Sequence, residues 1–184
     1  MTTALQRLKE CASLWSVSIA QTTESESSLL GMGIRGSNPV VLKISKAGSD
    51  EWNAGEILRA FNGDGTVRVH ESAPGAVLME RLDPGQQLVE LVRQGQDDKA
   101  TWILADVIKE LAHHTPPTVC PSTEDWARSF DRYLASGDQQ LPRDLVNKAT
   151  ALYRSLSGSQ QSTMLLHGDL QHYNVLFDSG RGWV

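Results

Sequence analysis

Cysteine is scarce in this sequence and long hydrophobic runs are absent, which excludes several classes of protein. The 184 residues include two cysteines, Cys11 and Cys120, which form no short-range metal or redox motif. We therefore expect free thiols rather than a disulfide framework. No apolar stretch approaches the roughly 20 residues that a membrane-spanning helix needs, and residues 1–20 lack the pattern of a secretory signal. We predict a cytoplasmic protein without a membrane partner.

An excess of basic residues is also missing. Lysine and arginine number 17 against 22 aspartates and glutamates, the formal net charge is -5, and no basic stripe runs along the chain. This argues against a nucleic-acid partner but does not exclude a local basic site for a phosphate. The apolar share of 40% and the charged share of 21% are typical of a globular protein with one domain or two small ones.

The first third of the chain has the pattern of an antiparallel sheet. Residues 15–20 (WSVSIA) alternate apolar and polar side chains, as a half-buried strand does. Residues 21–28 are polar and rich in hydroxyls, which predicts a loop. The apolar runs 29–34 and 39–44 flank the turn residues Arg35-Gly36-Ser37-Asn38, which predicts a hairpin.

One helix is expected after this hairpin. It should run over residues 50–61, with Ser49 as the N-cap and two acidic residues in its first turn. Short strands are expected at 67–69 and 76–79, around a Pro74-Gly75 turn.

A lobe boundary is predicted near residue 82. Leu82-Asp83-Pro84-Gly85 breaks the strand pattern, and we expect no strand directly after it. The predicted division is an N-terminal lobe over 1–81, built from an antiparallel sheet with one helix, and a C-terminal helical lobe over 82–184. Strands followed by helices indicate an α+β chain with two lobes.

The rest of the chain changes to a helical period. The expected helices are 87–94, 98–114, one that begins after Ser122 or Thr123 and ends at Gly137, and one from Pro142 to Gly158. Strands are expected again at 164–166 and 174–177.

The most specific signal is the loop between these last two strands. His167-Gly168-Asp169 is followed by Asn174, five residues after the aspartate. Phosphoryl transfer from ATP to an alcohol needs a carboxylate that orients the hydroxyl and a neutral oxygen ligand for Mg²⁺. The catalytic loop of protein kinases has the same spacing between its Asp and Asn.

Two other interpretations of this loop stay open. An exposed turn with Gly and Asp needs no function, and His167 could be a core histidine. Alternatively, His167, Asp169 and His172 could ligate a metal ion, which would suit a hydrolase.

The segment HGDLQHYN resembles the catalytic loop of the aminoglycoside phosphotransferases. More narrowly, it is similar to the streptomycin 6-kinase and hydroxyurea-resistance kinase branch, where a second histidine is common, as here at His172. The resemblance implies a protein-kinase-like fold that uses ATP and Mg²⁺ to phosphorylate a hydroxyl of a small molecule, such as the aminoglycoside streptomycin. It implies that Asp169 takes the hydroxyl proton, Asn174 holds Mg²⁺ and His167 braces the loop.

A lysine inside an apolar strand is the candidate for the ATP phosphates. In residues 40–44 (VVLKI), Lys43 shares a strand face with Val41; a lysine there either reaches solvent at an edge or serves a function. Kinase-like sites use such a lysine, held by a helix glutamate, to bind the α- and β-phosphates. We choose Glu51 as its partner because Glu51 extends the inner stripe of helix 50–61, with Glu56 as the fallback. Either glutamate could also be an ordinary solvated charge.

The resemblance places the adenine base beside the segment that leaves the first lobe. Met79 would border the base, and the backbones of Glu80 and Leu82 would bond it. The antibiotic kinases have serine-containing loops over the phosphates, and residues 22–28 match that place. The sequence has no Gly-x-Gly-x-x-Gly there; Gly31-Met32-Gly33 falls later and is a weak motif.

The resemblance also covers only about the first two-thirds of a family member. The second magnesium ligand and the acceptor pocket are expected beyond Val184, so we expect a kinase-like fold that is incomplete at its C-terminus and a chain with weak or no activity by itself. The alternative function is a non-catalytic nucleotide-binding or interaction remnant of the same fold.

Overall fold

The computed structural model describes residues 3–47 and 50–184, and the chain divides into two compact units. The first unit comprises Met1–Thr118 together with Met164–Val184, and the second comprises Val119–Thr163. This division by compactness differs from the predicted lobe boundary near residue 82, which stays a prediction.

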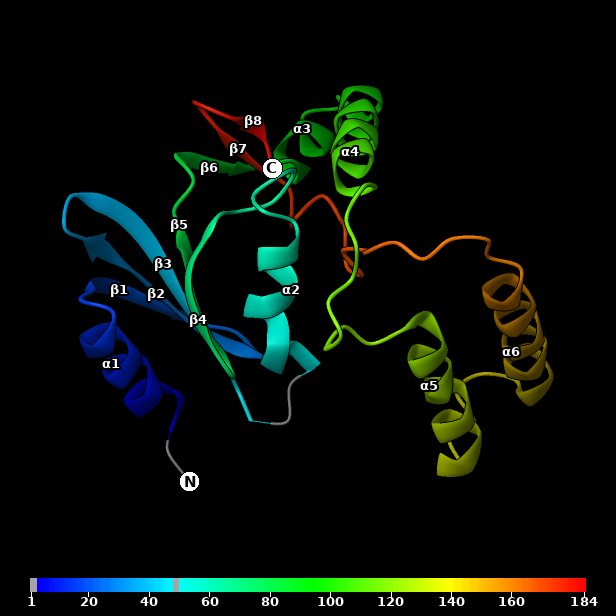
Figure 1. Cartoon of the computed structure of the whole chain (residues 1–184). Helices are drawn as coiled ribbons and strands as arrows, with labels where there is room; N and C mark the ends of the chain where they lie inside the picture. Colours follow the sequence, from blue (N-terminus) through cyan, green and yellow to red (C-terminus); the bar gives the residue numbers. More distant parts are fainter. Residues whose placement is uncertain (1–2, 48–49) are drawn as a thin grey trace. The chain divides into compact units, whose positions relative to one another are not determined.

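A five-stranded antiparallel sheet forms the centre of the first unit (Figure 1). Its strands, in the spatial order β1-β2-β3-β5-β4, are β1 (Ser18–Glu24), β2 (Ser28–Arg35), β3 (Asn38–Ser45), β5 (Ala76–Glu80) and β4 (Val69–Ala73). The predicted hairpin is confirmed as β2 and β3, with Leu29 opposite Ile44 and Arg35 opposite Asn38. Gly36 lies in the turn at φ 61°, a left-handed conformation that glycine adopts without strain.

The start of the chain differs from the prediction. Helix α1 (Ala4–Leu14) was not expected; the Thr3 side chain caps it by accepting from the Gln6 N–H at 3.2 Å. Trp15 follows α1 as its C-cap, so the strand predicted over 15–20 starts instead at Ser18 and continues to Glu24, inside the predicted loop. The alternation of residues 15–20 reflects burial and not a strand over the whole range. Trp15 and Val17 are buried in the core that α1 covers, but they lie between the end of α1 and the start of β1.

Two glycines of β2 let β1 and α1 approach closely. A Cβ atom at Gly33 would lie 2.2 Å from the Ser18 carbonyl oxygen, and one at Gly31 would lie 2.9 Å from Cδ1 of Ile19. The register of β1 against β2 shifts between Ile19 and Gln21. Gly31-Met32-Gly33 therefore serves close packing in the sheet and is not a phosphate-binding turn.

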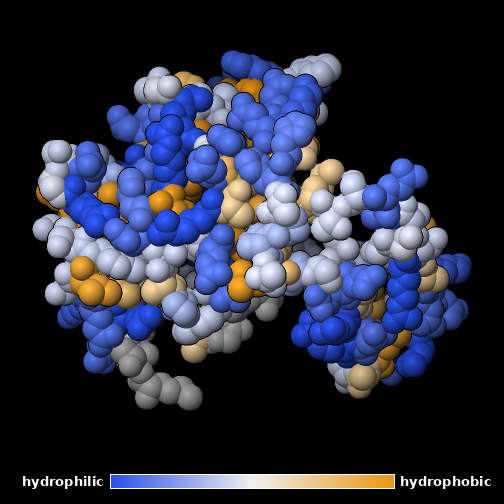
Figure 2. Space-filling model, in the orientation of Figure 1, coloured by the Kyte–Doolittle hydropathy of each residue, from blue (hydrophilic) through white to orange (hydrophobic). Residues whose placement is uncertain are grey.

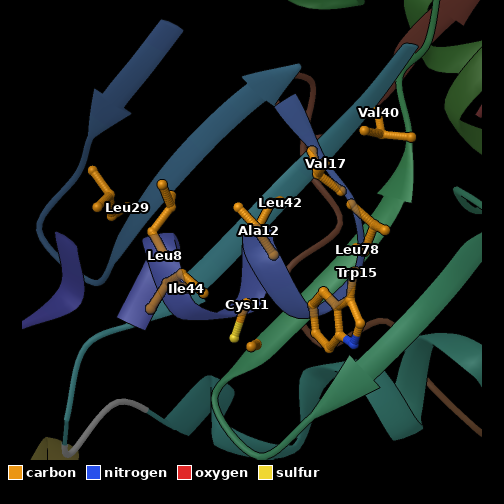
Figure 3. Close-up of a cluster of buried hydrophobic side chains, with 11 residues drawn as sticks. Leu8, Cys11, Ala12, Trp15, Val17, Leu29, Val40, Leu42, Ile44 and Leu78 are labelled. Carbon is orange, nitrogen blue, oxygen red and sulfur yellow. The ribbon is translucent and has the colours of Figure 1, made fainter. Parts of the chain in front are cut away.

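One face of the sheet packs against α1 and forms the hydrophobic core (Figure 3). Val40, Leu42 and Ile44, at alternate positions of β3, are at most 1% exposed. They meet Leu8 and Cys11 of α1 within this cluster. Burial of several such side chains supplies the main favourable term for this unit.

The opposite face of the sheet packs against α2 (Ala54–Ala60). The predicted helix over 50–61 is confirmed, but it begins as a 3-10 turn, η1 (Asp50–Asn53). A Cβ atom at Gly55 would meet Cβ of Ser72 at 2.5 Å and Cγ2 of Val77 at 3.2 Å, so the helix lies directly on β4 and β5. The predicted cap, Ser49, lies outside the described residues.

The rest of the first unit consists of helices and a small sheet. Its elements are β6 (Pro84–Gln87), α3 (Val89–Arg93), α4 (Asp97–Leu111), β7 (Leu176–Asp178) and β8 (Gly182–Trp183). The strand β6 corrects the expectation that no strand follows residue 85. No strand is assigned over 164–166 within the described chain; there Leu165 N–H donates to the His114 carbonyl at 2.8 Å. β6 pairs with β7 about 90 residues later, a partner that local pattern does not reveal.

The second unit is a pair of helices, α5 (Thr123–Ser136) and α6 (Arg143–Gly158). Ser122 caps α5 in a capping box with Asp125, and Gly137 ends it at φ 75°, as the sequence predicts. Phe130 of α5 and Tyr153 of α6 meet edge to face with ring centroids 5.5 Å apart.

Among the described residues, no helix is both long and apolar enough to cross a membrane. The face shown in Figure 2 is largely hydrophilic, with hydrophobic surface in smaller areas between the polar side chains.

Candidate functional site

The structure brings Lys43 and Glu51 together. Lys43 Nζ on β3 lies 2.9 Å from Glu51 Oε1 on η1, and the two side chains are 24% and 38% exposed. Glu56, the fallback partner, is exposed in the first turn of α2. The pair forms because Ser45 Oγ also donates to the Glu51 carbonyl at 3.2 Å, which fixes η1 against the end of β3.

Strand register places an apolar row next to this lysine. Met32, Val41 and Met79 are cross-strand neighbours on β2, β3 and β5. Side chains alternate along a strand, so Val41 shares the face of Lys43, away from the core under α1. Met32, Val41 and Met79 are only partly buried. The arrangement is a row of three partly buried apolar side chains with one positive charge beside it.

In the loop 167–174, the candidate metal ligand Asn174 is hydrogen-bonded to the candidate catalytic carboxylate of Asp169. Asn174 Nδ2 donates to the Asp169 carbonyl at 2.8 Å and to its Oδ2 at 2.9 Å. Gln171 Nε2 also donates to Asp169 Oδ1 at 3.2 Å. All three residues are exposed, so the carboxylate is oriented by amides and still open to solvent.

His167 lies within the electrostatic influence of both Lys43 and Asp169. Burial lowers the pKa of His167, the Asp169 carboxylate partly opposes this, and the Lys43 ammonium lowers it further. His167 Nδ1 accepts from the Asp169 N–H at 3.4 Å, which requires that this nitrogen carry no proton. The lysine of β3 and the carboxylate of the loop therefore act on the same neutral ring.

Three contacts hold the loop to the start of α3. Val89 N–H donates to the His172 carbonyl at 3.0 Å, Leu88 N–H to the Val175 carbonyl at 2.8 Å, and Gln87 Nε2 to the Tyr173 carbonyl at 2.9 Å. Sequence analysis missed these supports, and it also missed Gln171. Gln171 could have been found because it lies inside the motif, whereas the contacts of 87–89 join segments more than 80 residues apart.

A ring contact supports the other end of the loop. His114 lies edge to face on Phe61, with ring centroids 5.3 Å apart, and its carbonyl accepts from Leu165 N–H at 2.8 Å. Phe61 is 1% exposed at the end of α2. His114 thus contacts the end of α2 with its ring and, with its carbonyl, bonds a residue four positions before Asp169.

The segment after β5 offers backbone groups beside Met79. Within the described residues, the N–H and C=O of Leu82 make no intramolecular hydrogen bond. The Glu80 N–H, in contrast, donates to the Arg68 carbonyl at 3.0 Å and is not available.

The loop between β1 and β2 is shorter than predicted and is internally bonded. Thr22 and Thr23 lie in β1, and the Ser25 and Ser28 hydroxyls are 3.0 Å apart. Lys46 Nζ donates to the Ser25 carbonyl at 2.7 Å and pairs with Glu24 at 2.8 Å.

The alternative of a metal site for hydrolysis lacks a ligand cluster. Within residues 3–47 and 50–184, no group of three His, Cys, Asp or Glu side chains is placed to hold a metal ion. The Nε2 of His172 is buried and finds no hydrogen-bond partner within those ranges.

Sequence comparison identifies relatives of this chain. The profile described as aminoglycoside/hydroxyurea antibiotic resistance kinase matches residues 15–184. A streptomycin 3''-kinase from Klebsiella pneumoniae is 33% identical over 152 residues, which are 82% of this chain and 54% of the relative. The chain thus spans about half the length of that relative.

Solved structures show the same fold. The aminoglycoside phosphotransferase APH(4)-Ia matches with a TM-score of 0.68 at 15% identity, over 99% of this chain and 70% of that one. A thermostable mutant of it, in ternary complex with ADP and hygromycin B, matches with a TM-score of 0.63 at 16% identity, over 95% of this chain and 68% of that one. Choline kinase LicA from Streptococcus pneumoniae matches with a TM-score of 0.57 at 14% identity, over 98% of this chain and 67% of that one.

These likenesses confirm the predicted α+β, protein-kinase-like fold. The profile match extends over most of the chain and includes both Lys43 and the HGDLQHYN loop. The chain belongs to the aminoglycoside/hydroxyurea antibiotic resistance kinase family.

Proposed function

We propose that this chain carries the nucleotide site and catalytic loop of an ATP-dependent phosphotransferase that modifies a hydroxyl of an aminoglycoside, such as streptomycin. The observation that carries the proposal is the pairing of Lys43 with Glu51 at 2.9 Å, in a chain whose loop holds Asn174 against the Asp169 carboxylate at 2.9 Å. A phosphotransferase needs a cation for the phosphates and a carboxylate for the hydroxyl in one small space. Family membership and the streptomycin 3''-kinase relative support the substrate class.

The residues present fit a nucleotide with a magnesium ion. The row of Met32, Val41 and Met79 offers an apolar surface for a base, and Leu82 offers a free N–H and C=O next to it. Lys43 is a compact donor for phosphate oxygens, kept in place by Glu51 at 2.9 Å. ATP with Mg²⁺ supplies the transferable phosphoryl group and the charge that offsets its negative oxygens.

Asp169 and Asn174 have separate roles in this proposal. The Asp169 carboxylate accepts a hydrogen bond from the substrate hydroxyl and then its proton, which orients the oxygen for attack. Asn174 uses its Nδ2 on Asp169, at 2.9 Å, so its Oδ1 is left as the neutral oxygen for Mg²⁺. His167, neutral and bonded to the Asp169 N–H, positions the loop.

The phosphorylated product explains the resistance that the family description names. A phosphate adds charge of about -1.5 to -2 and bulk to a cationic antibiotic. The modified compound would fit poorly against an anionic RNA target.

The test is to compare the 184-residue chain with its Asp169→Asn variant. Calorimetry with Mg-ATP measures binding, and phosphate transfer to streptomycin measures turnover. We expect both proteins to bind Mg-ATP. Transfer by the unaltered chain is expected to be weak, so it is measured with protein in excess over labelled ATP, and the variant should lose it by about 100-fold or more, because a general base contributes that much. Asp106→Asn, which alters an exposed carboxylate of α4, is the control and should keep both properties.

The outcomes separate the two candidate functions. Transfer by the Asp169→Asn variant at the original rate would contradict the assignment of Asp169. Binding of Mg-ATP without transfer by the unaltered chain would favour a non-catalytic nucleotide-binding function.

A further inference from the structure

The side chain of Glu80, at the end of β5, is mostly buried and joins three segments. It is 18% exposed, and its Oε1 accepts from the main-chain N–H of Arg68 at 2.8 Å. The same oxygen accepts from the guanidinium of Arg181, in the turn between β7 and β8. A charge-assisted hydrogen bond of this kind is among the stronger ones in proteins.

This carboxylate takes the place of a backbone carbonyl in the sheet. The Glu80 N–H donates to the Arg68 carbonyl at 3.0 Å. In an antiparallel ladder the reciprocal bond would run from Arg68 N–H to the Glu80 carbonyl. Here that N–H donates instead to the carboxylate of Glu80, so the neighbouring chain segment does not use the Glu80 carbonyl.

The strand on the other side does not use this carbonyl either. Bonded and non-bonded pairs alternate along an antiparallel ladder. Arg81 N–H donates to the Pro39 carbonyl at 3.2 Å, so the next pair, Val40 and Glu80, is a non-bonded one. Within the described residues, the Glu80 carbonyl therefore has no main-chain partner on either side of β5.

Arg181 keeps the carboxylate in this position. Its guanidinium also donates to the carbonyls of Gly63 and Thr66, the latter at 3.0 Å, and its side chain is 18% exposed. These acceptors lie in the segment that follows α2. The arginine is held at three points, so the carboxylate cannot turn away from Arg68 without losing a buried charged partner.

We propose that the Glu80 side chain is a positioning group for base selection: it occupies the Arg68 N–H so that the Glu80 carbonyl is free to accept from the amino group of adenine. Guanine presents a carbonyl oxygen where adenine presents that amino group. Two facing acceptors repel, so the free carbonyl favours adenine over guanine nucleotides. This inference rests on the proposed nucleotide site.

The experiment measures the ratio of ADP to GDP affinity by calorimetry, with Mg²⁺, for the 184-residue chain. In Glu80→Ala the Arg68 N–H can bond the carbonyl at position 80, and we expect the preference for ADP to fall about tenfold, the worth of one hydrogen bond. In Glu80→Gln an amide oxygen still accepts from Arg68 N–H, so the preference should be kept.

The matched control is Glu71→Ala. Glu71 lies opposite Leu78 on the same two strands and pairs with Arg35 at 2.9 Å. Within the described residues, no hydrogen bond from a main-chain N–H to its carboxylate is found, so its loss should leave the ratio unchanged.

Equal loss of ADP and GDP affinity in Glu80→Ala, or an unchanged ratio, would overturn the inference and leave the proposed function intact. If Glu80→Ala does not fold, Glu80→Met, which keeps most of the side-chain volume but offers no oxygen to the Arg68 N–H, takes its place, and an unchanged ratio there would equally overturn it. Failure of the unaltered chain to bind either nucleotide would overturn the proposed function and this inference together.

Discussion

Alternate side chains of β3 enter two different environments on the two faces of the same sheet. Leu42 and Ile44 are fully buried under α1, whereas Val41 and Lys43 lie partly exposed on the side of α2. A single strand thus contributes to the core with one set of residues and to the candidate nucleotide site with the other. The comparison predicts that substitutions one residue apart change different properties.

The largest expected effect is on stability, at the buried face. Leu42→Ala should lower the free energy of unfolding by about 3 kcal/mol, because Leu42 is 0% exposed and its truncation would leave a cavity in the packed core under α1. Val41→Ala, its neighbour on the other face, should cost about 1 kcal/mol. Urea denaturation measures both. Equal costs would show that the two faces do not differ as the burial indicates.

A smaller effect is expected on binding, at the open face. Lys43→Met should weaken Mg-ATP binding roughly 10- to 100-fold, the worth of a hydrogen bond to a charged group. Lys109→Met is the control, because Lys109 is an exposed lysine of α4 that pairs with Asp106 at 2.7 Å, outside the candidate site.

Calorimetry on both variants decides the assignment of Lys43. If Lys109→Met weakened binding as much as Lys43→Met, the lysine of the site would be wrongly assigned.

The smallest expected effect is on the pH dependence of stability. Burial lowers the pKa of His167 in the folded protein below its unfolded value. Between these two values the unfolded chain binds more protons, so the free energy of unfolding should rise as the pH increases and level off above about 6.5. Urea denaturation from about pH 5 to about pH 7.5 measures this slope.

Subtracting the curve of His167→Asn isolates this histidine from the other titrating groups. A difference curve that falls with increasing pH over this interval would contradict the burial of a neutral His167.

Local signals in the sequence predicted several elements correctly. The hairpin of β2 and β3 followed from two apolar runs around turn residues, and the cap of α5 from Ser122 with acidic residues after it. Such features depend on neighbours in the chain, which is why they can be read without a structure.

Other elements could not be predicted from local pattern. Helix α1 was missed although Leu8 and Cys11 are buried in it, because only the sheet of later residues explains their burial. Strand β6 was missed because Pro84 and Gly85 read as a break, while its partner β7 lies about 90 residues later. Non-local pairing overrides propensity in both cases.

The roles of Lys43, Glu51, Asp169 and Asn174 stay predictions, but their placement shows the same contrast between local and non-local contacts. The motif HGDLQHYN by itself determined which carboxylate and amide share one turn, because Asp169 and Asn174 are only five residues apart in the chain. The bond from Arg68 N–H to Glu80 and the three contacts of Arg181 were decided only by the tertiary structure. The contacts of Arg181 join residues up to 118 positions apart, and such non-local partners cannot be found from local pattern because they meet only when the unit folds.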